Sequence, residues 1–200
     1  MNIVTRPIIK SDIDTVVKIH IAAFPDFFLT QLGSTFLQFY YKSVLKHKLG
    51  IMMGAYSDAG LIGFCAATQL SKSFNSSLII NNPFLFSFVG IRLLFRKPKA
   101  IIRLFKNLTK STSENNDDGS YAEILSISVD PKQQGGGVGK KLLKAVEEEL
   151  GKNKIDKLSL TTDYYNNDNA IKFYKSLEYK IMYVFETYPN RKMYRLIKNI

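Results

Sequence analysis

The sequence predicts an α/β fold in which a central mixed, mostly antiparallel sheet is flanked by helices. Two observations support this prediction. Segments with strand and helix periodicity follow the order strand, two helices, three strands, helix, strand, helix and two strands, and a glycine-rich turn joins one central strand to the next helix. Two hundred residues, 46% hydrophobic and 22% charged, suit one domain, residues 1–200, that carries an insertion at about 70–120.

Strands and helices are expected on both sides of this insertion. The expected strands are residues 3–6, 51–56, 61–68, 121–129, 157–162, 178–185 and 192–196. The expected helices are a first one that starts near Ser11 and stops before Pro25, then residues 34–47, 138–150 and 167–176, with Gly151 ending the third. The aromatic segment between the first two helices contains Phe27 and Phe28, which are either core residues or contacts to a substrate.

The net charge of +11 arises mainly in the insertion. No acidic residue lies between Asp58 and Glu114, and residues 98–110 predict an amphipathic basic helix. Its charged face is either simply solvated, a lid over an anionic substrate, or a contact to a membrane surface. The apolar run Phe84 to Ile91 is too short to span a bilayer, and no DNA-binding motif accompanies the charge, so nucleic acid is not the expected partner.

Cysteine and histidine are too sparse to predict a metal site or a disulfide. Cys65 lies in an apolar run, and neither His20 nor His47 has a partner nearby in sequence, so both histidines are interpreted as packing or surface residues. A single cysteine and an N-terminus without a secretory signal favour the cytoplasm.

The turn after the strand at 121–129 is the most informative feature. Its glycines allow the backbone to approach a phosphate group, and the following helix adds unpaired N–H groups. The Walker pattern fails, because Gln134 stands at the first glycine position and Lys141 replaces the hydroxyl residue; the dinucleotide fingerprint fails at Lys140. The remaining pattern is Gln134-x-x-Gly137-x-Gly139. A flexible turn with no ligand is the alternative.

The helix after the turn carries charges opposite to those its dipole favours. Lys140 and Lys141 lie at its positive end, and residues 147–149 are glutamates near its negative end. Each placement costs a few tenths of a kcal/mol. A polyanion at the helix start would turn the two lysines into favourable contacts.

This turn and the segments around it resemble the GNAT acyl-CoA N-acyltransferases. Three pieces occur in that order: A-E-I-L-S-I-S-V-D-P, Q-G-G-G-V-G-K-K-L-L and N-N-D-N-A-I-K-F-Y-K-S-L-E-Y. The resemblance covers Ala122 to Tyr179 by motif and the first 70 residues by element order. It implies a GNAT fold with the basic helical insertion between the third and fourth strands. The usual L-G-F is Leu177-Glu178-Tyr179 here, which puts the local entry to the next strand in doubt.

The resemblance implies a role for named residues. Acetyl-CoA would pair with Ile127, Ser128 and Val129, its pyrophosphate would meet the turn, and Asn167 would help to position the thioester. The pyrophosphate-binding residues implied are Gln134, Gly135, Gly136, Gly137, Val138, Gly139 and Lys140. Tyr174 matches a general acid for the CoA thiolate, and Glu123 stands where several members carry a base. Tyr174 packed on the sheet and Glu123 pointing to solvent are the alternatives.

The expected reaction is direct acetyl transfer to a primary amine of a small molecule, such as an amino sugar or a nucleotide-linked amino sugar. A protein or peptide amine is the enzymatic alternative. A non-catalytic CoA-binding module that contacts a membrane surface or another anionic partner is the alternative of a different class. The final strands could also pair two subunits in a homodimer.

Overall fold

The computed structural model describes residues 2–82 and 117–200. Seven strands form one sheet in the order β1-β2-β3-β4-β5-β7-β6, in which β4 and β5 are parallel and all other neighbours antiparallel. The strands are β1 (Val4–Pro7), β2 (Gly50–Ser57), β3 (Gly60–Thr68), β4 (Ala122–Val129), β5 (Lys157–Asp163), β6 (Lys180–Thr187) and β7 (Arg191–Asn199). The predicted mixed, mostly antiparallel sheet is therefore confirmed.

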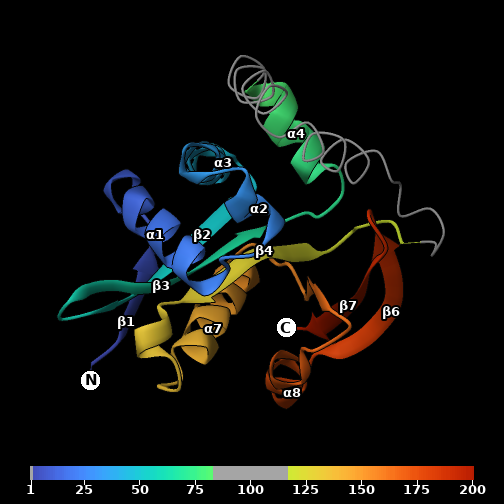
Figure 1. The fold of residues 1–200 in the computed structure, drawn as a ribbon. Coiled ribbons are helices and arrows are strands. Elements are labelled where there is room, and N and C mark those ends of the chain that lie inside the picture. Colours follow the sequence, from blue (N-terminus) through green and yellow to red (C-terminus); the bar gives the residue numbers. More distant parts are fainter. Residues whose placement is uncertain (1, 83–116) are drawn as a thin grey trace.

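Helices cover both faces of this sheet (Figure 1). On one face lie α1 (Ile13–Ala23), α2 (Phe28–Gln31) and α3 (Ser34–Lys46), and on the other lie α7 (Val138–Lys152) and α8 (Asp168–Ser176). The remaining helical elements are η1 (Lys10–Asp12), α4 (Phe74–Asn81) and η3 (Pro131–Gln133). No helix within residues 2–82 and 117–200 has the length and apolar character that a bilayer crossing requires.

Two apolar clusters hold the helices on the sheet. The α7 stripe predicted from the sequence is buried, with Leu142, Val146 and Leu150 fully covered against the sheet. On the opposite face, Val16 of α1 and Leu37 of α3 are fully buried. Each completely buried aliphatic side chain contributes about 2 kcal/mol of transfer free energy, so these two faces fix the positions of α1 and α7 relative to β4.

The beginning of the predicted insertion belongs to this core. The helix α4 was not predicted, yet its Phe74 and Leu78 are buried in the cluster of α1 and α3. The spacing of Phe74 and Leu78 is typical of a helix, but a short segment with polar residues on both sides is equally typical of a loop. Residues 83–116, which include the predicted basic helix at 98–110, lie outside the described residues.

Two helix ends differ from the predictions. Gly151 lies inside α7, and the left-handed residue after that helix is Lys154, with φ of 58°. After α8, Glu178 takes φ of 71°, and the N–H of Tyr179 donates to the carbonyl of Tyr174 at 3.1 Å. The turn that a glycine usually makes is therefore present with a glutamate, and the entry to β6 is kept.

Candidate functional site

The site begins where β4 and β5 separate. Their parallel pairing ends at Ile124 opposite Leu160. Just beyond this point Leu125 is an extra residue in β4, because Ile124 faces Ala67 and Ser126 faces Ala66 on β3. Such a bulge bends and twists its strand. Because β4 then follows β3 while β5 follows β7, the sheet opens between the two halves visible in Figure 1.

The opening exposes backbone groups of β4. The N–H of Asp130 donates to the carbonyl of Ile62 at 2.8 Å, so Asp130 faces β3. Residues opposite each other in an antiparallel pair alternate between hydrogen-bonded and non-hydrogen-bonded. Ser128 therefore also faces β3, and the N–H and C=O groups of Ile127 and Val129 point towards the gap on the β5 side. An extended ligand with amide groups could bind there as an added strand would.

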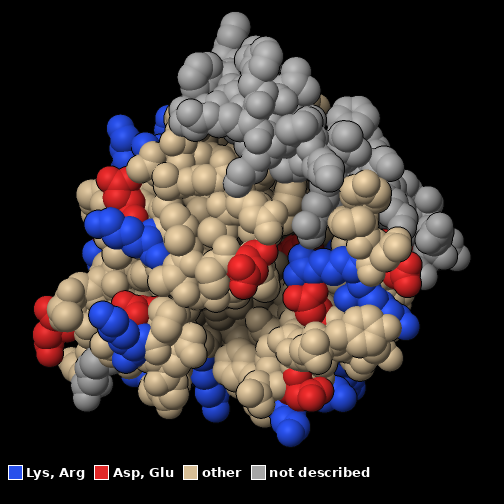
Figure 2. Space-filling view, viewed as in Figure 1, with Lys and Arg blue, Asp and Glu red and all other residues tan. Residues whose placement is uncertain are grey.

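The gap is a cavity of about 920 Å³. Figure 2 shows a hollow between the two halves of the molecule, with mainly uncharged walls and charged residues around it. The walls come from the end of α1 and the aromatic segment after it, from β4, β5 and the glycine turn, and from α8 and β7. The lining residues used below are His20, Phe24, Phe27, Phe28, Ser126, Ile127, Ser128, Val129, Gln134, Gly135, Asp163, Asn167, Phe173, Tyr174 and Arg191.

The glycine turn has a backbone that side-chain-bearing residues rarely adopt. Asp130 begins it, since its carboxylate accepts from the N–H of Lys132 at 2.9 Å. Gly135 and Gly137 have φ of 86° and 74°, and a Cβ built on either would have no atom within 4 Å. Backbone conformation, not crowding, therefore requires these two glycines. Gly139 differs, because a Cβ there would lie 3.3 Å from the ring of Phe173, so this glycine permits close approach of α7 and α8.

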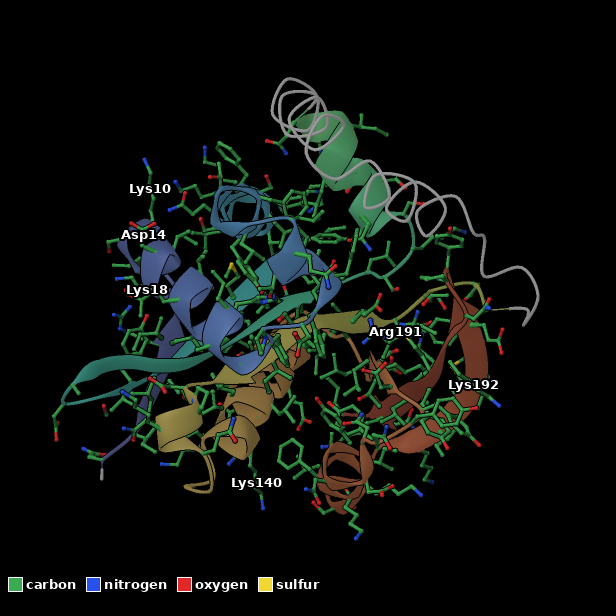
Figure 3. All side chains as sticks on the ribbon, viewed as in Figure 1. Lys10, Asp14, Lys18, Lys140, Arg191 and Lys192 are labelled. Carbon is green, nitrogen blue, oxygen red and sulfur yellow. The ribbon has the colours of Figure 1, made fainter. Side chains whose placement is uncertain are left out.

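The start of α7 is suited to an anion. Gly137 supplies no capping side chain, and the first turn contains no acidic residue. The first N–H groups of a helix have no partner within it and carry the positive end of its dipole. Lys140 lies in this first turn, near the glycine turn (Figure 3). This arrangement favours a bound phosphate.

The glutamates at the other end of α7 are compensated, which the sequence pattern alone did not indicate. Each of them has a lysine partner: Lys198 lies 2.8 Å from Glu147, Lys144 lies 3.8 Å from Glu148, and Lys152 lies 2.8 Å from Glu149. At the start of the helix, the ammonium of Lys141 donates to the carbonyl of Ile3 at 3.3 Å, which leaves the charge of Lys140 for a ligand to explain.

Tyr174 lies at the inner wall of the cavity. It is 9% exposed, and its ring packs edge-on against Phe173 and Tyr179 at centroid distances of 5.2 and 5.7 Å. Burial raises the pKa of its hydroxyl well above the ordinary value of 10. The phenol is therefore protonated at neutral pH and can donate its proton only to a strongly basic neighbour.

Asn167 holds the loop between β5 and α8. Its side-chain amide donates to the hydroxyl of Thr162 at 2.5 Å and to the carbonyl of Asp163 at 3.2 Å. These bonds fix the residue that precedes α8, and with it the direction of the helix that carries Tyr174.

The side chain of Glu123 is held by two partners outside the cavity. Its carboxylate lies 2.5 Å from the guanidinium of Arg195 and accepts a hydrogen bond from Ser71 through its other oxygen. Glu123 and Arg195 are 15% and 8% exposed, and Glu123 does not line the cavity. Burial alone would lower the pKa of Arg195, but Glu123 and the hydroxyls of Tyr121 and Tyr183 outweigh it and raise the pKa above its ordinary value, so the guanidinium stays charged.

His20 is a cavity residue that the sequence interpretation missed. It is 2% exposed, its Nδ1 lies 2.6 Å from the hydroxyl of Tyr41, and its Nε2 has no hydrogen-bond partner among the described residues. Burial lowers its pKa from 6.5 to about 4, so the ring is neutral at pH 7. A lone histidine on an apolar helix gives no sequence signal of a site, because Tyr41 and the cavity approach it only in the folded chain.

The aromatic segment forms the outer wall. Phe24 and Phe27 stack at 4.5 Å, and Phe27 is 42% exposed. The guanidinium of Arg191 lies 5.3 Å from the Phe27 ring and makes two bonds, of 2.6 and 2.7 Å, to the carboxylate of Asp163. A bidentate ion pair therefore lies beside this aromatic wall.

The structure brings most of the predicted residues together. The cavity described above is lined by Ile127, Ser128, Val129, Gln134, Gly135, Asn167, Tyr174, Phe27 and Phe28. Gly136, Gly137, Val138, Gly139 and Lys140 continue from it along the turn and the first turn of α7, where Val138 is buried in the core. Within the described residues, no three histidine, cysteine, aspartate or glutamate side chains are grouped so that they could hold a metal ion.

Comparison with known proteins gives the family. The sequence matches the model of the acetyltransferase (GNAT) family over residues 13–179. No curated protein matches it. Similar solved structures include the ribosomal-protein-S18-alanine N-acetyltransferase of Escherichia coli, with 14% identity and a TM-score of 0.62 over 100% of this chain and 94% of that one. They also include Arabidopsis thaliana NAA60 with acetyl-CoA, with 19% identity and a TM-score of 0.62 over 100% and 99%.

A third similar structure is the PaiA N-acetyltransferase of Thermoplasma acidophilum in complex with coenzyme A, with 14% identity and a TM-score of 0.57 over the full length of both chains. At these identities the structures establish the shared fold. The family model covers most of the chain and includes the bulged strand, the glycine turn and the helix of Tyr174. This protein therefore belongs to the GNAT family of acetyltransferases and is an acyl-CoA N-acyltransferase.

Proposed function

We propose that this protein transfers an acetyl group from acetyl-CoA to a primary amine, and that Tyr174 protonates the departing thiolate. One observation carries the proposal. A single cavity joins the unpaired edge of β4, the glycine turn and the buried hydroxyl-bearing side chain of Tyr174. Acetyl-CoA supplies the acyl group as a thioester, and similar structures of this fold hold acetyl-CoA or coenzyme A.

The residues present fit this co-substrate. The amides of the pantetheine arm would pair with the free N–H and C=O groups of Ile127 and Val129. The pyrophosphate would meet the N–H groups of the turn and of the first turn of α7, with Lys140 supplying a positive charge. Ser128 adds a buried hydroxyl that has no partner among the described residues, in the wall of the same cavity.

Tyr174 suits the acid role because its environment keeps it protonated. A thiolate that forms beside Tyr174 shares these buried surroundings, which also make the thiolate a stronger base, and the phenol is still protonated when the thiolate forms. The predicted role of Glu123 as base stays a hypothesis. It would require the carboxylate to give up one of its bonds to Arg195 and Ser71.

For the acceptor we propose a small primary amine. The aromatic segment and β7 both line the cavity, and the ion pair of Asp163 with Arg191 offers charge beside an aromatic wall. An amino sugar or nucleotide-linked amino sugar remains the proposed class. A protein or peptide amine is the main alternative, since the similar structures include the S18-alanine enzyme and NAA60 with a bisubstrate analogue. A location in the cytoplasm, contact with a membrane surface and a homodimer remain predictions.

Calorimetry with acetyl-CoA tests the binding site. Gly137→Val should weaken binding at least tenfold, because a β-branched residue cannot keep φ of 74° and the start of α7 would shift. Gly60→Val is the matched control. Gly60 also has a positive φ, of 103°, and no atom within 4 Å of a built Cβ, but it lies in the β2–β3 hairpin. Equal affinity of the Gly137→Val variant and the wild type would refute the assignment.

Release of CoA tests the reaction. Glucosamine, spermidine and a peptide with a free N-terminal alanine would be compared as acceptors, and no release with any amine in the presence of bound acetyl-CoA would favour the non-catalytic module. With an active acceptor, Tyr174→Phe should lower kcat by about 100-fold and leave the Kd for acetyl-CoA within a factor of two. An unchanged kcat would remove Tyr174 from the acid role.

A further inference from the structure

One wall of the cavity lies outside the proposed acetyl-CoA site. Acetyl-CoA would occupy the gap side of β4, the glycine turn and the surroundings of Tyr174, and the rest is lined by the end of β5, the start of β7 and the aromatic segment after α1. Asp163 is the last residue of β5 and Arg191 the first of β7. Among the described residues that line the cavity, these two carry a charge. Their side chains are 30% and 29% exposed, so both keep surface that a ligand can reach.

The two side chains hold each other in one orientation. Nε and Nη2 of Arg191 donate to the two carboxylate oxygens of Asp163, at 2.6 and 2.7 Å. The guanidinium also lies 5.3 Å from the ring of Phe27, and Phe24 stacks on Phe27 at 4.5 Å. A bidentate ion pair is geometrically specific, and the ring contact favours the same position of the guanidinium. An acceptor would therefore meet a pair that is already in place.

The pair keeps capacity for further hydrogen bonds. A guanidinium has five N–H groups and an ionised carboxylate about four acceptor sites, and the two bonds between them use two of each. Nη1 of Arg191 makes no hydrogen bond within residues 2–82 and 117–200. The wall proposed for the acceptor therefore offers donors and acceptors next to each other.

The same pair offers little net charge. Its closest nitrogen and oxygen are 2.6 Å apart, so an anionic group of a ligand would be attracted by Arg191 and repelled by Asp163 from nearly equal distances. For a cationic group the two signs are reversed. A charged group would also lose water on entering the cavity, and this loss would not be compensated. An uncharged group that both donates and accepts can instead bond to both side chains at once.

We infer that Asp163 and Arg191 select the acceptor, an inference that rests on the proposed function. They bind an uncharged group of the acceptor that donates a hydrogen bond to Asp163 and accepts one from Arg191. They exclude acceptors that place a second charge, of either sign, at this position. A hydroxyl of an amino sugar and an amide of a peptide share the required chemistry, whereas the second ammonium of a polyamine does not have it.

Calorimetry on the wild-type protein saturated with CoA tests this selection without turnover, because CoA carries no acetyl group. One set of amines consists of glucosamine, glucosamine 6-phosphate and 2,6-diamino-2,6-dideoxyglucose, which differ only in the hydroxyl, phosphate or ammonium at carbon 6. The second set consists of alaninamide, alanine and 1,2-diaminopropane, which carry an amide, a carboxylate or an ammonium beside the amine. Binding of one set identifies the sugar or the peptide as the source of the bound group.

In the set that binds, the uncharged member should have a Kd about tenfold or more below that of either charged member. Equal affinities for all three members would overturn the inference. Absence of binding in both sets would overturn it as well, since each set contains an amine with the required uncharged group.

Two substitutions should change the selection in opposite directions. Asp163→Asn removes the negative charge and should lower the Kd of the anionic member by about tenfold relative to the uncharged one, and Arg191→Gln should do the same for the cationic member. A general loss of structure would weaken all three members, so it cannot produce a gain by one. Unchanged ratios of the three Kd values in these variants would overturn the inference, and the wild-type selection is a test that needs neither variant.

Lys192→Gln is the matched control for Arg191→Gln. It removes a positive charge from the next position of β7, where successive side chains point to opposite faces of the sheet. The ammonium of Lys192 lies 4.4 Å from the ring of Tyr164, and Lys192 does not line the cavity. This variant should therefore keep the wild-type ratios, and a gain by the cationic member here would show that the overall charge of the protein, not the ion pair, sets the selection.

Release of CoA from acetyl-CoA with the same amines separates the inference from the proposed function. The expected selection in binding without any release of CoA would reject the reaction and leave the selection by Asp163 and Arg191 intact. Release of CoA with equal kcat/KM for all three members of a set would retain the reaction and reject the selection.

Discussion

Lowering the pH from 7 to 5 is expected to destabilise this protein by about 2 kcal/mol through His20 alone. In the unfolded chain this histidine has a pKa of 6.5, and in the folded chain burial lowers it to about 4. Between these values the unfolded state binds a proton that the folded state does not, so the stability present above pH 6.5 is lost as the pH falls. At pH 5 the unfolded ring is almost fully charged and the folded ring is about one-tenth charged, which gives this magnitude.

The assay is urea unfolding of the wild type and His20→Gln at pH 7 and pH 5. Glutamine does not titrate in this range, so the difference between the two pH dependences isolates His20, and contributions common to both proteins cancel. His47 is such a contribution, since burial and Lys48 lower its pKa in both. An equal loss of unfolding free energy in the wild type and the variant would show that His20 is protonated or solvated in the folded state, and would refute the reasoning.

Two further predictions concern stability, both measured as the free energy of urea unfolding. Glu178→Gly should stabilise the protein by about 0.5–1 kcal/mol, because a left-handed backbone strains a residue that carries a side chain. As a control, Lys172→Gly inside α8 should destabilise the protein by about 1 kcal/mol. A loss of stability in Glu178→Gly would contradict this account. Arg195→Met should lower the free energy of unfolding by about 3 kcal/mol, because it leaves the carboxylate of Glu123 without its cation, and adding Glu123→Leu should recover part of that loss. An unchanged stability of Arg195→Met would contradict this role of the ion pair.

Local patterns predicted most of the elements. The stripe of α7, its glycine start, and the order of strands and helices all depend on residues within a few positions of one another, where period and turn chemistry act directly. Helix ends were less predictable. Gly151 was expected to end α7, but a glycine within a helix costs only about 1 kcal/mol, and the helix continues through it to Lys152. At Glu178 the fold imposed a turn that local preference opposes.

In the candidate site, too, some features could be predicted from local patterns and others could not. The glycine turn, the family and the cavity residues between Ile127 and Tyr174 could be predicted from local motifs, because these motifs are contiguous and have a fixed spacing. Contacts between residues far apart in the sequence became visible only in the folded chain. Folding joined Glu123 to Arg195 and Ser71, paired the glutamates of α7 with lysines, and placed His20 beside Tyr41 in the cavity. Spacing along a chain reports the contacts of one element, whereas burial and charge pairing depend on which elements pack together.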